Sequence, residues 1–292
     1  MHRLCGKAHE VILFQYVSSL DAAHSIVCMS EFFPLIHLPA IGFAIGIIIG
    51  LTGVGGGSLM TPILVGGLGI PPAIAVGTDL LFASITKSFG AVVHWRIGNV
   101  AKRLLAVLIG SSLTGAALAF ALIHQLQPNI EALNKVIKTS LGFALFITAF
   151  ALLIRPWLLK FRRTHAVAAS AQDVQGNVWA TAVLGVAIGA VVMLSSVGAG
   201  AIGVTALLLL HPSLPITRVV GTDIAYAVPL TAAAGLAHAS VGHLDVNLLI
   251  GLLVGSVPGI LLGARLSKRV PEIATRSMLV AALSFAGVKL VA

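Results

Sequence analysis

Long apolar runs separated by short polar segments make up most of the chain. The runs with few or no charged residues are 35–51, 104–123, 139–154, 178–194 and 244–263. A helix needs roughly 20 residues to cross a hydrocarbon core about 30 Å thick. Membrane-spanning strands would need only about 10 residues and would alternate in polarity, which these runs do not. The pattern predicts an all-α polytopic membrane protein with one transmembrane domain in two halves.

The two halves carry two copies of one pattern, at 41–123 and 183–269. Each copy has an apolar run, a break of small residues, a turn with Pro, the tripeptide Gly-Thr-Asp, and an apolar run that ends in His. From the Pro turn onward the matched positions lie 144 residues apart, and they include Pro71 and Pro215, Asp79 and Asp223, His94 and His238, Gly98 and Gly242, and Gly115 and Gly259. Matched Gly- and Pro-broken segments in a membrane chain are typical of a secondary transporter whose site lies at the breaks.

Each half is expected to hold one broken segment followed by three helices. The broken segments are 38–67 and 179–211, and the second arm of each has about 10 residues, which is too short to cross the membrane. The two arms are therefore expected to enter and leave on the same side. The helices are predicted at 73–95, 101–123 and 137–156, and at 216–238, 244–266 and 271–291.

Four parts follow from this division. They are an N-terminal tail at 1–34, a first transmembrane repeat at 35–156, a polar cytoplasmic linker at 157–177, and a second transmembrane repeat at 178–292. The tail is expected to be poorly ordered. The alternative for residues 1–28 is that they lie upstream of the true start at Met29.

The basic residues lie in short clusters between the apolar runs. The net charge is +9, and the clusters are at 96–103, 155–163 and 265–269. Such clusters follow the positive-inside rule, whereas a nucleic-acid site needs a basic patch on a soluble face, so no nucleic-acid partner is expected. The basic loop follows the Gly-Thr-Asp helix in the first half and comes one helix later in the second. If basic loops are cytoplasmic, the halves are inverted repeats.

The breaks are the predicted substrate site. Consecutive Gly residues do not hold a helix well, since each costs about 1 kcal/mol against Ala, and unwound backbone in a membrane is tolerated where it lines a cavity. The N-terminus of the following helix can bind an anion without a charged side chain. The predicted substrate-binding residues are Gly55, Gly56, Gly57, Ser58, Thr78, Ser196, Gly198, Gly200 and Thr222. The alternative is that these Gly residues only allow close helix packing.

Asp79 and Asp223 are the acids that fall inside predicted spans. An ionisable residue in a membrane helix is a functional hypothesis by default, so both are candidates to carry a coupling proton. The alternative is a structural cap near the helix start. Because an acid repels an anion, neither is expected to lie against the substrate. Lys87 is expected to pair with Asp79, to bind the anion or to snorkel to an interface. His94 and His238, at matched helix ends, are either proton relays or interfacial caps.

Composition limits the other classes of function. Apolar residues are 58% of the chain and charged residues 9%, against about 25% charged residues in a soluble domain. No metal-binding or nucleotide-binding motif is present, so no cofactor and no metal are expected. An intramembrane enzyme would need a nucleophile–base pair or a metal set, and the Ser and His residues are scattered, so the protein is not expected to be an enzyme.

The ordered set of motifs resembles the sulfite exporter TauE/SafE family of bacterial inner-membrane permeases. The motifs are Gly-x-Gly-Gly-Gly with Pro62, Val76-Gly77-Thr78, His94 with Gly98-Asn99-Val100, Val220-Gly221-Thr222, His238, Gly242 and Gly263-Ala264-Arg265. The resemblance covers roughly residues 38–290. It implies transport of small sulfur-containing anions, such as sulfite, thiosulfate or organosulfonates, across the inner membrane. Asp79 and Asp223 depart from the family pattern, in which many members have a hydroxyl residue.

The sequence therefore predicts a secondary transporter that works by alternating access, and it leaves open whether transport is coupled to protons. A passive anion channel on the same scaffold is the alternative, and its flux would survive neutralisation of Asp79 and Asp223. A transporter of an unrelated small anion is a further alternative. The expected partners are a small anionic substrate and the lipid bilayer, and a homodimer is left open.

Overall fold

Every regular element in the part of the chain that the structure describes is a helix. The computed structural model describes residues 38–51, 57–126, 128–165, 177–266 and 272–291. The first half holds the helix Leu38–Leu51, α2 (Gly57–Gly66), α3 (Pro72–Arg96), α4 (Lys102–Leu126) and α5 (Ile130–His165). The second half holds α6 (Val178–Ser195), α7 (Ala201–Leu210), α8 (Ile216–Ser240), α9 (Val246–Leu266) and α10 (Glu272–Val291). The predicted all-α class is confirmed.

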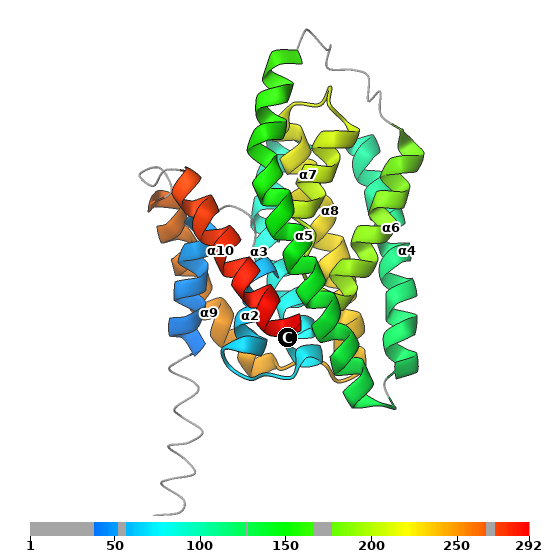
Figure 1. Cartoon of the computed structure of the whole chain (residues 1–292), viewed down its shortest axis with the longest axis vertical. Helices are drawn as coiled ribbons and strands as arrows, with labels where there is room; N and C mark the ends of the chain where they lie inside the picture. The colour runs from blue at the N-terminus through cyan, green and yellow to red at the C-terminus, as the bar shows by residue number, and fades with distance from the viewer. Residues whose placement is uncertain (1–37, 52–56, 127, 166–176, 267–271, 292) are drawn as a thin grey trace, which may run out of the picture.

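Six of the described helices are long and apolar enough to cross a membrane. They are α3, α4, residues Ile130–Leu159 of α5, α6, α8 and α9. The helices run side by side along the long axis of the molecule (Figure 1). α6, with 18 residues, belongs to this set although it was predicted as an arm of the second broken segment. α10 (Glu272–Val291) agrees with the helix predicted at 271–291. The protein is a multi-pass membrane protein.

The second broken segment folds back on itself, as predicted. α6 ends at Ser195, and α7 begins at Ala201 and has 10 residues. His211 follows α7, and its Nε2 atom lies 2.8 Å from Oγ1 of Thr181, near the start of α6. The two arms therefore enter and leave at the same end of the molecule. Residues 52–56, between the two arms of the first broken segment, lie outside the described residues.

The corresponding helices of the two halves, α3 and α8, lie antiparallel. Gly77, near the start of α3, packs against the carbonyl of His243, just beyond the end of α8. Gly221, near the start of α8, packs in the same way against the carbonyl of Asn99, just beyond α3. Each contact is the other shifted by 144 residues in both partners. An inverted pair of helices requires this relation, while inversion of the complete halves stays a prediction.

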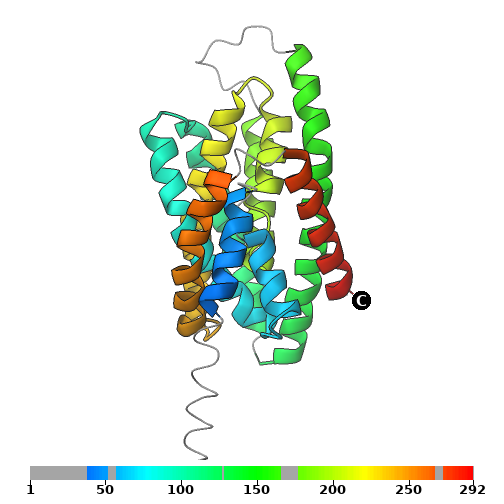
Figure 2. The same ribbon diagram turned by 90° about the vertical axis from the view of Figure 1, so that its left-hand side faces the viewer.

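The two halves also pack against each other at close Gly contacts. A Cβ on Gly115 of α4 would collide with the carbonyl of Val186 in α6, and one on Gly259 of α9 would collide with the carbonyl of Phe43. The first arm of each half therefore packs on the second long helix of the other half, and Figure 2 shows the arm Leu38–Leu51 along α9. Small residues allow backbones in a membrane to approach this closely.

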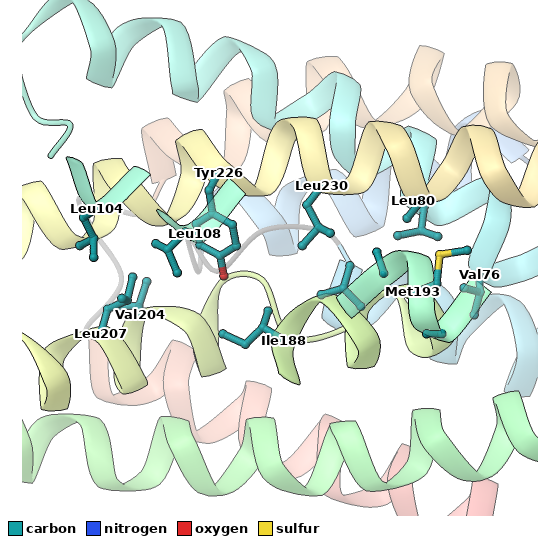
Figure 3. Close-up of a cluster of buried hydrophobic side chains, with 14 of the residues drawn as sticks. Val76, Leu80, Leu104, Leu108, Ile188, Met193, Val204, Leu207, Tyr226 and Leu230 are labelled. Atoms are coloured by element: carbon teal, nitrogen blue, oxygen red, sulfur yellow. The ribbon is translucent and has the colours of Figure 1, made fainter. Parts of the chain in front are cut away.

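A buried apolar cluster joins α4, α6, α7 and α8 at the contact between the halves. Tyr226 extends from α8 towards α6 and α7 and lies close to Leu108 and Ile188 (Figure 3). All three side chains are buried. This packing holds α7 and α8 together next to the second break, which fixes the position of the groups described below.

Candidate functional site

A cavity of about 280 Å³ lies between the two halves, beside the second break. Its lining comes from the helix Leu38–Leu51, α3, α5, α7, α8 and α9. The polar side chains in the lining are Thr86, Lys87, Arg155 and Asp223, and Gly200 contributes backbone. Pockets for drug-sized ligands are about 300–1,000 Å³, so this cavity suits a small solute.

Lys87 extends from the middle of α3 to the second break. Its ammonium group donates a hydrogen bond of 2.8 Å to the carbonyl of Ala199. It is also close enough to both Asp223 and Asp79 for a charge–charge interaction. Of the three sequence alternatives, snorkelling to an interface is therefore not what the structure shows. The side chain links the first half to the break of the second.

The N-terminus of α7 faces this cavity without a side-chain cap. Gly200 precedes the helix in a backbone conformation with φ 137° that favours Gly, and no side chain accepts from the first N–H groups. Gly200 and Ala201 both line the cavity. The first N–H groups of a helix have no partner within the helix, and the helix dipole places about half a positive charge there. An anion in the cavity would therefore meet backbone donors and two basic side chains.

Arg155 is a site residue that the sequence analysis did not identify. It closes the apolar run 139–154 and was assigned to the basic cluster that follows it. The structure shows that α5 continues to His165, into the stretch predicted as the polar linker, so Arg155 lies within the helix and lines the cavity. Pro156 directly follows Arg155, and because Pro usually ends or kinks a helix, no signal in the sequence indicated that the helix continues past Arg155.

Asp223 lies in the same cavity, and the expectation that neither acid lies against the substrate stays a prediction. Its side chain is 1% exposed and lines the cavity with Lys87 and Arg155, which both act on its charge. Its Oδ1 atom and the hydroxyl of Tyr226 both face the Cα of Gly203 on α7. A Cβ at position 203 would collide with the carboxylate, so Gly is needed for this contact.

Asp79 occupies the matched position in the first half but does not line the cavity. Its side chain is fully buried. Oγ1 of Thr61, on α2, donates a hydrogen bond to its Oδ2 atom. Ser196, which follows α6, lies beside the same carboxylate. The two matched acids therefore have different surroundings, one closed and one facing a cavity.

Thr78 and Thr222, predicted as substrate ligands, bind backbone groups outside the cavity. Oγ1 of Thr78 accepts a hydrogen bond of 3.2 Å from the N–H of Asp245. Oγ1 of Thr222 accepts one of 2.9 Å from the N–H of Ala101. Thr78 therefore binds the loop that follows α8, and Thr222 binds the loop that follows α3. The two hydrogen bonds are related by the same shift of 144 residues.

His94 and His238 lie at matched helix ends, as predicted, and neither lines the cavity. Nδ1 of His94 is close to Gly221. Nε2 of His238 lies 3.0 Å from the carbonyl of Met193. These contacts tie the ends of α3 and α8 to their neighbours, and a relay role for the two His residues stays a prediction.

The predicted residues at the breaks are only partly described. Gly55 and Gly56 lie outside the described residues, and Gly57 and Ser58 are the first residues of α2. Ser196 and Gly198 belong to the second break and have left-handed backbone, with φ 58° and 129°. Within the described ranges, no group of three or more His, Cys, Asp or Glu side chains is placed to hold a metal ion.

A second cavity, of about 410 Å³, has a different character. It lies between the helix Leu38–Leu51, α2 and α10, and its lining is apolar except for Lys289 at one end. The ammonium group of Lys289 donates a hydrogen bond of 3.0 Å to the carbonyl of Gly66. This second cavity lacks the convergent polar groups that line the cavity beside the second break.

The helices, the breaks and the cavity between the halves define a polytopic membrane transporter. The chain belongs to the sulfite exporter TauE/SafE family, which it matches over residues 38–290. No solved structure matches the chain.

Three relatives from Bacillus subtilis (strain 168) carry the description of a probable membrane transporter protein. YjnA is 36% identical over 250 residues, which are 86% of this chain and 97% of YjnA. YdhB is 26% identical over 249 residues, which are 85% of this chain and 96% of YdhB. YunE is 33% identical over 88 residues, which are 30% of this chain and 32% of YunE.

Proposed function

We propose that this protein is a secondary transporter that moves small sulfur-containing anions, such as sulfite, thiosulfate or organosulfonates, by alternating access. The observation that carries the proposal is the convergence of Lys87, Arg155 and the N-terminus of α7 on one small cavity. Charged donors and a helix N-terminus both favour an anion. The sulfur chemistry is supported by the family, whose description is that of a sulfite exporter.

The position of the cavity supports alternating access. It is lined by helices of both halves, and one of its walls is the break that precedes α7. In transporters built from two repeats, one repeat rocks against the other around a site at discontinuous helices. A small movement between the halves would change the cavity walls while Lys87 and the break remain near the substrate.

The local charges support coupling to a proton. Lys87 and Arg155 balance Asp79 and Asp223, so the four charges sum to zero before a substrate enters. A bound monoanion would leave one excess negative charge in a medium of low dielectric constant, where unbalanced charge is expensive. A proton on one of the two acids restores neutrality. An anion can bind beside Asp223 when the charge of that carboxylate is offset by a proton or by the side chains of Lys87 and Arg155.

The test is transport by the purified protein in proteoliposomes. We would measure uptake of radiolabelled sulfite, thiosulfate, sulfoacetate and taurine, with and without an imposed proton gradient. Accumulation of one anion above its equilibrium level, driven by the gradient, is the expected result. Flux that only equilibrates would favour a channel or uniporter. If none of the four compounds crosses, the proposed substrate class is wrong.

A further inference from the structure

We propose that Asp79, Thr61 and Ser196 form a site for one monovalent cation, H⁺ or Na⁺, that is separate from the anion cavity. The coupling role of this site rests on the proposed transport function, but cation binding does not. The three residues come from α3, from α2 and from the end of α6. The site therefore joins the first half to the break of the second.

The site has buried oxygen atoms that lack a hydrogen-bond partner. Asp79 and Thr61 are fully buried, and Ser196 is 5% exposed. Thr61 donates to Oδ2 of Asp79, whereas Oδ1 of Asp79 and Oγ of Ser196 have no partner among the described residues, although the two side chains are adjacent. An unpaired buried carboxylate oxygen is costly. A proton on Oδ1 shared with the hydroxyl, or a Na⁺ between the two oxygens, would satisfy both atoms.

The end of α6 adds a negative potential at this point. Ser196 is the C-terminal cap of α6, and its own N–H is bonded to the carbonyl of Val192. The last carbonyls of a helix have no partner within the helix, and they carry the negative end of its dipole. A carboxylate beside such an end is unfavourable alone and favourable with a cation. The C-terminal ends of discontinuous helices coordinate Na⁺ or H⁺ in other transporters.

Ser196 is held in an unusual backbone conformation. Its φ of 58° makes it the only non-Gly residue with positive φ in the described part of the chain. Such a conformation costs of order 1 kcal/mol or more for a side chain with a Cβ. Gly would avoid this cost, so a Ser at this position is consistent with a use for its hydroxyl group.

Asp223, at the matched position in the second half, has more basic neighbours than Asp79. Asp223 is acted on by both Lys87 and Arg155, while the charged group that acts on Asp79 is Lys87 alone among the described residues. Lys87 is itself bonded to the carbonyl of Ala199. Thr205, the counterpart of Thr61, has no hydrogen-bond partner for its hydroxyl in the described part. Asp79 therefore has one basic neighbour, which it shares with Asp223, whereas Asp223 has two, although Oδ1 of Asp223 also lacks a hydrogen-bond partner in the described part.

The test uses the full-length protein in detergent, without any anion substrate. One arm titrates NaCl against choline chloride and follows the unfolding temperature and binding of radioactive ²²Na⁺. The other arm records the infrared carbonyl band of a protonated carboxyl group as pH is varied. The variants are Asp79→Asn and Ser196→Gly, which keeps the left-handed backbone unstrained. Asp223→Asn and Thr205→Ala, at the matched positions, are the controls.

Either of two results would support the proposal. For Na⁺, the wild type and both controls are stabilised by the ion, Asp79→Asn is not, and Ser196→Gly binds about tenfold more weakly, which corresponds to ~1.4 kcal/mol. For H⁺, Na⁺ has no effect, and the carboxyl band disappears in Asp79→Asn, shifts in Ser196→Gly and persists in Asp223→Asn.

The proposal is overturned if both signals survive in Asp79→Asn, if neither signal exists in the wild type, or if Asp223→Asn removes the signal as completely as Asp79→Asn does. Size-exclusion chromatography checks folding, and if Asp79→Asn does not fold, Ser196→Gly and Thr61→Ala decide the question. Since no sulfur-containing anion is present and chloride accompanies both cations, these results do not depend on whether the protein transports sulfur-containing anions.

Discussion

At the residue scale, the cavity beside the second break combines one acid, Asp223, with two bases, and the matched acid Asp79 is buried outside it. Asp79, Asp223 and Lys87 could be identified from the sequence as candidate functional residues, because charged residues are rare inside apolar runs. Arg155 could not, because a basic residue at the end of such a run looks like part of a cytoplasmic loop. Thr78 and Thr222 flank the predicted acids, but their hydroxyl groups are used to fasten loops. Local sequence does not show which way a helical side chain faces.

Replacement of Lys87 by Gln is expected to weaken anion binding by tenfold or more. A hydrogen bond to a charged group contributes about 1.5–3 kcal/mol, and the change also removes the positive charge from the cavity. The measurement is the concentration of sulfite or thiosulfate that gives half of the maximal rise in unfolding temperature. Lys289→Gln is the matched control, because that ammonium group binds the carbonyl of Gly66 at the other cavity. Equal affinity in both variants would contradict an anion-binding role for Lys87.

At the element scale, the broken segments were predictable and the helix lengths less so. Small residues and a Pro turn mark each break, and the structure gives the second arms α2 and α7 10 residues each. α5, however, extends from Ile130 to His165, well beyond the predicted 137–156. A helix can continue into water beyond its apolar stretch, because polar residues do not by themselves end a helix. The apolar pattern therefore reports the length in lipid and not the length of the helix.

The contact between α4 and α6 is expected to tolerate no added methyl group at Gly115. A Cβ there would collide with the backbone carbonyl of Val186, and overpacking typically costs about 1–3 kcal/mol. Gly115→Ala should therefore lower the unfolding temperature in detergent. Gly110→Ala in the same helix is the control, because a Cβ there meets no atom within 4 Å, and Ala favours helix by about 1 kcal/mol. Equal unfolding temperatures for Gly115→Ala and Gly110→Ala would contradict close packing at Gly115.

His211, which holds the end of α7 to the start of α6, is expected to make stability depend on pH. Burial lowers the pKa of His211 below its ordinary value of 6.5. The unfolded chain therefore binds more protons, and stability is lost as pH falls below the unfolded pKa towards the folded one. Between pH ~7.5 and ~5.5, the unfolding temperature should fall more in the wild type than in His211→Gln. Parallel pH profiles would contradict this role.

At the scale of the whole molecule, the two halves interlock by contacts that repeat with the 144-residue spacing. The repeat itself was visible in the sequence, and so was the family resemblance, which is confirmed over residues 38–290. The packing of each first arm on a helix of the other half was not predicted. It involves Gly115 of α4 against α6 and Gly259 of α9 against the helix Leu38–Leu51. Gly residues at such contacts show that some backbone approaches closely, but they do not show which one.

Cysteine labelling tests the predicted topology. The ends of α4 and α8 lie at one end of the molecule, and the loop between α7 and α8 lies at the other. In a variant whose Cys5 and Cys28 are replaced by Ser, single cysteines at exposed positions Pro128 and Ser240 should react with an impermeant thiol reagent from outside the cell. A cysteine at Ser213 should react only after the membrane is opened. Labelling of all three from outside would contradict the assignment.

The measurement that tests the central claim most directly is anion exchange in proteoliposomes containing the wild type, Lys87→Gln or Lys289→Gln. Exchange of labelled sulfite or thiosulfate needs no gradient, so it reports whether the cavity between the halves binds the anion and opens to both sides. The wild type and Lys289→Gln are expected to exchange the anion at similar rates, and Lys87→Gln at least about tenfold more slowly at low substrate concentration. Undiminished exchange by Lys87→Gln would show that the anion crosses the protein by a route other than this cavity.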